Sequence, residues 1–283
     1  MDNVSQIRMF FLSGLNETNN HRITLFLLTL LCYCVILLVN ISVIVTIIID
    51  KNLHEAMYIL LCTFCMNELY GTAGFYPKFL WDLLSPVHVI SYSGCLVQAQ
   101  VMYSFACADL SILSVMAYDR YVAICRPLEY HSVMSKQRVI VLACLSWLTP
   151  FCVMGINVFL TTRLKLCSPF IARLFCVNWI IVKLACFPSE TTISSIVAYI
   201  AIVMAKFMQT CVPHLTSLLI FLVAISFDVL SMKFGSKDLP QTLQNIVAVE
   251  FLVIPPLMNP LIYGFKLTKI RNRILGVISL KTK

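Results

Sequence analysis

Met116-Ala-Tyr-Asp-Arg-Tyr-Val-Ala-Ile-Cys125 is the stretch around which the rest of the chain is organised. It directly follows a long apolar segment, and it carries Asp119 and Arg120 side by side where a membrane helix is expected to run out into water. Charged side chains are costly inside a bilayer, and those that are kept usually serve a function or lie at the interface. The stretch therefore predicts a functional helix end.

The composition indicates a membrane protein with several spans. Of 283 residues, 60% are hydrophobic and only 12% are charged, and the mean hydropathy is +0.89. Soluble domains carry about 25% charged residues. Apolar stretches of about 18 residues or more with few charges predict membrane helices. Such stretches include Ile23–Ile49, Met57–Tyr76, Leu96–Tyr118, Val139–Thr162 and Thr242–Phe265.

The net charge of +8 does not indicate a nucleic-acid partner. The basic residues are dispersed between the apolar stretches, as the positive-inside rule requires of cytoplasmic loops, and do not gather on one soluble face. Residues 1–20 are polar and lack the charged-then-apolar layout of a cleavable signal peptide. We expect the first span to act as the insertion signal.

The stretch Met116–Cys125 resembles the third-helix signature of the olfactory receptors, a branch of the rhodopsin-like G-protein-coupled receptors. A second motif, Pro255-Pro-Leu-Met-Asn-Pro-Leu-Ile-Tyr263, resembles the Pro-x-Leu-Asn-Pro-x-Ile-Tyr pattern of that family's last helix. One departure is Ala56, which stands where the family usually has proline before the pair Met57-Tyr58. The resemblance implies an all-α membrane protein, a seven-transmembrane helix bundle. The single receptor domain would span 1–283, with an extracellular N-terminus (1–22), a transmembrane bundle (23–265) and a cytoplasmic tail (266–283).

The resemblance also implies a conformational switch at the inner end of the bundle. An arginine held by its neighbouring aspartate can be released to meet a heterotrimeric G protein, and the last helix is loosened by its proline. The residues that match this switch are Asp119, Arg120, Tyr121, Asn259, Pro260 and Tyr263. A simple charge pair at a helix end explains the residue types but not the ten-residue context.

A pocket for a small odorant is implied in the outer half of the third span. The candidate lining residues are Met102, Tyr103, Ser104 and Phe105. Aromatic, sulfur and isolated hydroxyl groups suit a small, mostly apolar ligand, although at helical spacing such residues also serve ordinary packing. The predicted protein is a receptor in the plasma membrane and not an enzyme, and its partners are an odorant, a G protein and the lipid bilayer.

Glu68 and Asp109 match acidic residues of the family in the second and third helices. Two carboxylates in adjacent helices raise at least one pKa unless a cation or a proton lies between them. The resemblance implies a sodium site, so the pair is our only metal-binding candidate. The alternative is that each is a neutral, hydrogen-bonded acid.

Four of the thirteen cysteines lie in or beside polar loops, namely Cys95, Cys167, Cys176 and Cys186. An even number of loop cysteines suits an oxidising exterior, but the sequence alone permits three pairings. The resemblance implies a bond between Cys95 and Cys176, which leaves Cys167 and Cys186 for a second bond. Glycosylation sequons begin at Asn3 and Asn16, and Asn40 matches a first-helix asparagine of the family.

The region after the outer loop departs from the family pattern. Thr191–Phe227 is 37 residues long, whereas two spans need roughly 20 residues each plus a turn. The stretch 205–215 resembles the start of the family's sixth helix, so the inner half of the fifth helix and the third cytoplasmic loop are shortened. Basic residues both in the second inner loop and in the tail require two crossings here, and therefore an abbreviated fifth helix.

Three other functions were weighed. A transporter or channel could use Glu68, Asp109 and Glu250 as an ion path, but no repeated halves or broken-helix pairs are visible. An intramembrane enzyme would need a nucleophile with a base, or a set of metal ligands, and His214 alone supplies neither. The remaining alternative is a truncated, non-signalling receptor that lacks part of helix five and the third cytoplasmic loop.

Overall fold

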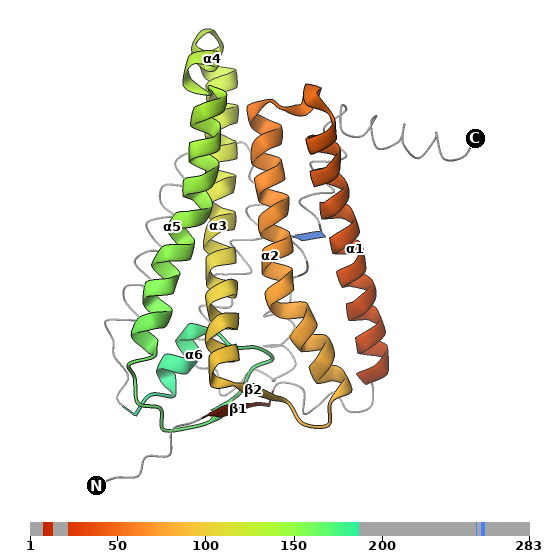
Figure 1. The fold of residues 1–283 in the computed structure, drawn as a ribbon, viewed down its shortest axis with the longest axis vertical. Coiled ribbons are helices and arrows are strands. Elements are labelled where there is room, and N and C mark those ends of the chain that lie inside the picture. Colours follow the sequence, from red (N-terminus) through yellow and green to blue (C-terminus); the bar gives the residue numbers. More distant parts are fainter. Residues whose placement is uncertain (1–7, 14–21, 187–252, 254–255, 258–283) are drawn as a thin grey trace, which may run out of the picture.

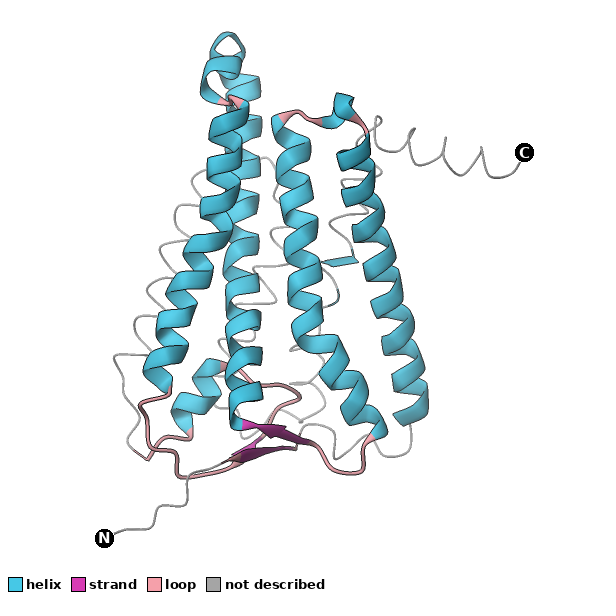
Figure 2. Ribbon diagram, viewed as in Figure 1, coloured by secondary structure: helices cyan, strands magenta, loops and turns pink. Residues whose placement is uncertain are grey.

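The structure, a computed structural model, describes residues 8–13, 22–186, 253 and 256–257. Most of the described chain is helical (Figures 1 and 2). The elements in order are β1 (Met9–Leu12), α1 (Arg22–Ile49), the 3-10 helix η2 (Lys51–Leu53), α2 (Ala56–Leu84), β2 (Val89–Ser91), α3 (Tyr92–Cys125), the 3-10 helix η3 (Pro127–Glu129), α4 (Tyr130–Val133), α5 (Lys136–Thr161), β3 (Phe170–Ile171) and α6 (Asn178–Lys183).

Four long helices run side by side along the long axis of the molecule (Figure 1). Helix α2 packs between α1 and α3, and α5 packs against α3. The small sheet and α6 lie at one end of these helices, and α4 lies at the other. We call these the outer and the inner end, respectively, after the expected orientation in the membrane.

Three of the described helices, α1, α3 and α5, are long and apolar enough to cross a membrane. In α1 the buried residues form one narrow stripe, Ile36, Asn40, Val43 and Ile47. Much of the remaining surface of α1 is apolar and exposed; Leu38, for example, is 68% exposed. An apolar exterior of this kind suits contact with lipid, since a soluble protein rarely exposes large contiguous apolar patches.

The four expected spans that fall within the described residues are helices. Predicted boundaries and observed ends differ by a few residues, except that α2 continues to Leu84 and α3 to Cys125, beyond the expected ends at Tyr76 and Tyr118. Helix α3 starts where the Ser91 hydroxyl accepts a hydrogen bond from the backbone N–H of Gly94, at 3.1 Å. Serine is a favoured N-cap because it satisfies an otherwise unpaired N–H in the first turn.

A close approach between α2 and α3 depends on two glycines. A Cβ atom on Gly71 would lie 2.4 Å from the ring of Phe105, and one on Gly74 would lie 2.4 Å from Cγ1 of Val101. No real side chain fits at such distances. The absent side chains therefore set the spacing of the two helices.

The outer end carries a feature that an all-α fold does not include. Strand β1 pairs antiparallel with β2 and parallel with β3, so the strand order is β2-β1-β3. Alternate residues of β1 are buried, and Phe10 and Leu12 pack on a cluster that contains the Cys95–Cys176 bond. The expectation of a purely helical fold is corrected to this extent, because Met9–Leu12 finds strand partners in two outer segments far away in sequence. Its four residues are all apolar, so only their burial, and not the sequence, alternates with the period of a strand.

Candidate functional site

The inner end of α3 holds a buried carboxylate with two partners. Asp119 is fully buried, and its Oδ2 accepts hydrogen bonds from Nε of Arg120 at 2.9 Å and from Nη2 of the same side chain. Its Oδ1 accepts a 2.8 Å hydrogen bond from the phenol of Tyr130, at the start of α4. Both oxygens of the Asp119 carboxylate are therefore engaged. Tyr121, the third predicted switch residue of this helix, is 45% exposed.

Tyr130 is a functional residue that the sequence analysis missed. Burial is the main cause that raises the pKa of its phenol to about 12, and the adjacent Asp119 raises the pKa further. The phenol therefore stays protonated and remains a donor at neutral pH. One signal for it is present in the sequence. Tyr130 lies eleven residues after Asp119 and shortly after Pro127, which forms a turn.

A second polar group lies in the middle of the bundle, where α2, α3 and α5 meet. The Nδ2 atom of Asn67 donates to Oδ1 of Asp109 at 2.7 Å and to the backbone carbonyl of Phe105 at 3.1 Å. The indole Nε1 of Trp147 donates to Oδ1 of Asn67 at 3.1 Å. Asn67 thus links three helices, and the sequence analysis did not single out this residue or Trp147.

The two acids that were predicted to bind sodium, Glu68 on α2 and Asp109 on α3, are both fully buried. Among the described residues, Oδ2 of Asp109 has no hydrogen-bond partner. A buried carboxylate oxygen of this kind is a suitable oxygen ligand for a small hard cation. No group of three or more His, Cys, Asp or Glu side chains suited to a metal occurs in the described part of the chain.

Asn40 connects α1 to the last predicted span. Its Nδ2 atom donates to the carbonyls of Ile36 and Pro256, each at 3.0 Å. Val253 and Leu257 pack against a cluster of α1, α2 and α3 side chains at the outer half of the bundle. These contacts place part of the last predicted span beside α1.

The four predicted odorant-binding residues do not share one environment. Met102 and Phe105 are buried in the same outer cluster as Phe75, Phe79 and Phe175. The Ser104 hydroxyl faces α2 instead, where it lies 2.9 Å from the phenol oxygen of Tyr70. Tyr103 is half-buried. Ser104 and Phe105 therefore serve contacts between α2 and α3, and a role of any of the four in ligand binding stays a prediction.

Two disulfides tie the outer loop to the bundle. Cys95, in the first turn of α3, is bonded to Cys176, and Cys167 is bonded to Cys186. Of the three possible pairings, this is the one that the resemblance implies. The second bond closes a short loop in which the backbone N–H of Cys167 donates to the carbonyl of Leu184 at 2.8 Å.

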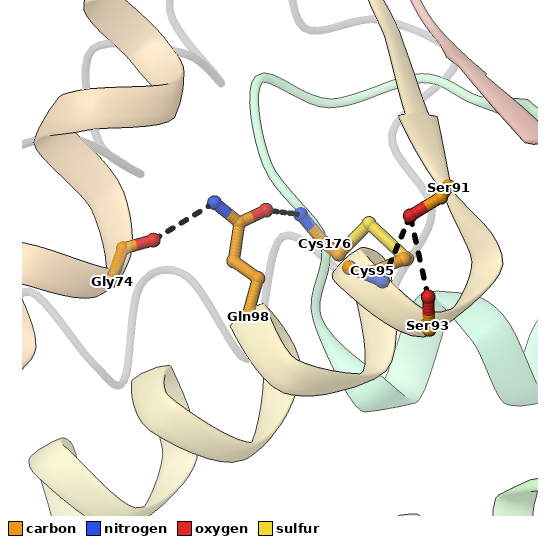
Figure 3. Close-up of a disulfide and its surroundings, with 7 residues drawn as sticks. Gly74, Ser91, Ser93, Cys95, Gln98 and Cys176 are labelled. Carbon is orange, nitrogen blue, oxygen red and sulfur yellow. Dashed lines mark hydrogen bonds between the residues drawn. A yellow bond between two sulfur atoms is a disulfide. The ribbon is translucent and has the colours of Figure 1, made fainter.

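Gln98 fixes the first disulfide to α2 (Figure 3). Its Nε2 atom donates to the carbonyl of Gly74 at 3.0 Å, and its Oε1 accepts from the backbone N–H of Cys176 at 2.9 Å. One amide side chain on α3 thus bridges the neighbouring helix and the outer loop.

The other predicted site residues lie outside the described residues. They are the switch residues Asn259, Pro260 and Tyr263, and the sequon asparagines Asn3 and Asn16.

Comparison with known proteins decides the family. A family model described as olfactory receptor matches residues 29–208 and 195–281. The chain belongs to the olfactory receptor family. Relatives include human olfactory receptor 4M1, 30% identical over 98% of this chain and 96% of the relative, and mouse olfactory receptor 4B13, 32% identical over 97% of both. Human olfactory receptor 6N1 is 32% identical over 96% of this chain and 95% of the relative.

Olfactory receptors are G-protein-coupled receptors of smell that cross the membrane several times, and they are not enzymes. The described part of this olfactory receptor carries both a disulfide-tied outer end and the buried Asp119 at the inner end.

Proposed function

We propose that the chain is an odorant-binding receptor of the plasma membrane, with seven crossings, that signals through a heterotrimeric G protein. The observation that carries this proposal is the arrangement at Asp119. One buried carboxylate holds Arg120 from the same helix and Tyr130 from the following loop. An ion pair with a further partner on a separate segment can adopt two discrete arrangements, which is what a switch requires.

In the resting arrangement Asp119 restrains Arg120. When an odorant binds among the outer halves of the helices, with Met102 and Tyr103 as candidate contacts, it favours the state for which it has the higher affinity. In that state the inner ends of the helices separate and Arg120 faces the G protein. Asn259, Pro260 and Tyr263 would contribute the corresponding change in the last helix.

Glu68 and Asp109 fit a sodium ion that favours the resting state. The supporting observation is the unpartnered Oδ2 of Asp109, because a buried carboxylate oxygen without a partner is costly. When bound, the ion would supply positive charge between the two carboxylates. Substitution of both residues by their amides should abolish any dependence of signalling on sodium, and an unchanged dependence would refute the site.

The second candidate function, a receptor that reaches the membrane but does not signal, is favoured by the region that follows the outer loop. The family model matches in two blocks that meet at residues 195–208. The alignment with human olfactory receptor 4M1 extends over 306 residues whereas this chain has 283, so the alignment includes at least 23 positions that this chain lacks. A shortened fifth helix and third inner loop would account for both findings and would remove part of the surface that a G protein meets.

Odorant-evoked cyclic AMP in cells separates the two functions. A mixture of small volatile alcohols, aldehydes and esters is applied to cells that express the chain, with surface expression measured in parallel. A response that is lost in the Arg120→Ala variant at equal surface expression supports the signalling receptor. A chain that reaches the surface and gives no response to any fraction of the mixture supports the non-signalling alternative.

A further inference from the structure

A groove of about 560 Å³ lies between the outer halves of α2 and α3, apart from the predicted odorant residues. Its walls are Tyr70, Ala73, Gly74, Lys78, Gly94, Val97, Gln98 and Val101, with residues 89–91 of β2 at the rim. Val97 and Val101 on α3 and Ala73 on α2 make much of this wall apolar. Val97 is 64% exposed, so the groove opens on the outside of the bundle.

The position of the groove fits one leaflet of a bilayer. Lys78 and Tyr70 are eight residues apart on α2, which corresponds to about 12 Å along the helix. The hydrocarbon part of one leaflet is about 15 Å thick. The groove is therefore long enough to follow an acyl chain through most of one leaflet.

The two ends of the groove differ in polarity. The rim has the Lys78 ammonium and the exposed Ser91, whereas the deep end is closed by Val101 and Tyr70. The Tyr70 hydroxyl is already engaged by Ser104, at 2.9 Å, and the Gln98 amide by Gly74 and Cys176. The Ser91 hydroxyl is engaged as well, by the backbone N–H of Gly94 at 3.1 Å, so the Lys78 ammonium is the rim group with donors left for a ligand.

The charge at the rim is positive. Lys78 is paired with Asp82, but an ammonium group has three donors, and the Lys78 side chain is 25% exposed. Arg22 adds a second cation beside the rim, because its Nη2 atom donates a 2.9 Å hydrogen bond to Nε2 of His88, the residue before β2. His88 is the acceptor in this bond, since arginine cannot accept one, and is therefore neutral. Lys78, Arg22 and Asp82 together leave a net positive charge at this end of the groove.

We infer that this groove binds one phospholipid of the surrounding bilayer. One acyl chain lies along α2 and α3 past Val97, and the phosphate lies against the Lys78 ammonium at the rim. The apolar walls and their length match an acyl chain, and the positive rim matches the phosphate. The opening toward the membrane lets the lipid enter from the bilayer. The bound lipid would fill the space between α2 and α3 beside Gln98, the residue that positions the disulfide-tied loop.

A photo-crosslinking experiment tests the acyl chain. The full chain is reconstituted in phosphatidylcholine vesicles that contain a phosphatidylcholine analogue with a diazirine at the end of one acyl chain, and labelled peptides are mapped by mass spectrometry. Labelling is expected to concentrate on residues 70–73 and 98–101, at the deep end of the groove where the acyl chain ends. The Val97→Trp variant should lower this labelling about fivefold, equivalent to about 1 kcal/mol of binding.

The matched control is Ile156→Trp, since Ile156 is 61% exposed on α5 and does not line the groove. Both variants place a tryptophan on an exposed apolar surface, so both should fold. Equal labelling of all exposed helices, or labelling that Val97→Trp does not change, would overturn the proposal and leave only ordinary bilayer contact. Labelling that an odorant mixture displaces would also overturn it, because the groove would then be an odorant site.

A second probe tests the phosphate. A diacylglycerol analogue with the same acyl chains lacks the headgroup phosphate. The double variant Lys78→Met/Asp82→Asn removes the cation without leaving Asp82 as an unpaired buried charge. It should lower labelling by the phosphatidylcholine analogue and leave labelling by the diacylglycerol analogue unchanged. An equal effect on the two probes would contradict a contact between Lys78 and phosphate.

Discussion

The phenol of Tyr130 lies 2.8 Å from Oδ1 of Asp119, on the opposite side of the carboxylate from Arg120. The inner end of α3 is therefore held to the following loop by a hydrogen bond to a charged, buried acceptor. Hydrogen bonds of this kind contribute more than neutral ones. The restraint on Arg120 thus depends on a residue outside the signature Met116–Cys125.

Loss of the Tyr130 hydroxyl should release this restraint in part. The Tyr130→Phe variant removes one donor to Asp119 and keeps the aromatic ring, which packs against the inner cluster of α2, α3 and α5. We expect ligand-independent cyclic AMP to rise about tenfold, because a hydrogen bond to a charged acceptor contributes about 1.5 kcal/mol to the resting state, and a loss of about 1.4 kcal/mol changes the equilibrium by that factor. Tyr118→Phe is the control, since Tyr118 is exposed and is not one of the predicted switch residues. Equal basal signalling in wild type and Tyr130→Phe would show that Tyr130 does not restrain the switch.

The bridge at Gln98 should stabilise the outer end. In Gln98→Leu the buried backbone N–H of Cys176 loses its acceptor, at a cost of about 1–3 kcal/mol. We therefore expect a lower unfolding temperature in detergent, with both disulfides still formed. Gln100→Leu is the comparison, because within the described part of the chain the Gln100 side chain makes one hydrogen bond, to the carbonyl of Phe151. The bridging role would be contradicted if Gln98→Leu lowered the unfolding temperature no more than Gln100→Leu does.

Stability at the outer end should fall in mild acid. Burial, together with the nearby Arg22, lowers the pKa of His88 below its ordinary value of 6.5. The unfolded state therefore binds the proton more readily, and stability is lost as the pH falls below about 6.5. Unfolding temperatures at pH 5 and pH 7.5 measure this difference, and His88→Gln should reduce it. The control is His54→Gln, at the inner end, which should show the same difference in unfolding temperature between pH 5 and pH 7.5 as the wild type. If His88→Gln also kept this full difference, His88 would not be its cause.

Asn67 and Trp147 should be energetically coupled. A double-mutant cycle with Asn67→Leu and Trp147→Phe measures the bond between Oδ1 of Asn67 and the indole N–H directly. Interhelical hydrogen bonds in membranes contribute about 0.6 kcal/mol on average and about 1.7 kcal/mol at most, so a coupling energy in this range is expected. Additive effects of the two substitutions on unfolding would mean that the bond contributes nothing.

Much of the helical framework could be predicted, because long apolar stretches between charged loops have few alternatives in a membrane. The spans that became α1, α3 and α5 follow directly from Ile23–Ile49, Leu96–Tyr118 and Val139–Thr162. The two disulfides agree with the pairing that the family resemblance implies. The contact between Arg120 and Asp119 was expected, because the ten residues Met116–Cys125 resemble the third-helix signature of the family.

Contacts between residues far apart in sequence could not be predicted. Gln98 and Asn67 look like isolated polar residues in apolar stretches, and only the packing of neighbouring helices shows what they bridge. The contact of the Ser104 hydroxyl with Tyr70 could not be predicted, because a single helical position does not reveal which neighbour it meets, whereas the role of Ser104 in ligand binding stays a prediction. Strand β1 was missed since its four residues form a sheet only with partners 80 and about 160 residues away.

Antibody access to tags at the two ends of the chain tests the seven-crossing receptor most directly. Cells that express the doubly tagged chain are stained intact and again after permeabilisation. The account predicts an N-terminal tag that is visible on intact cells and a C-terminal tag that is visible only after permeabilisation, which requires two crossings within the short stretch Thr191–Phe227. Both tags visible on intact cells would mean an even number of crossings, with the tail outside and out of reach of a G protein, and would contradict the account.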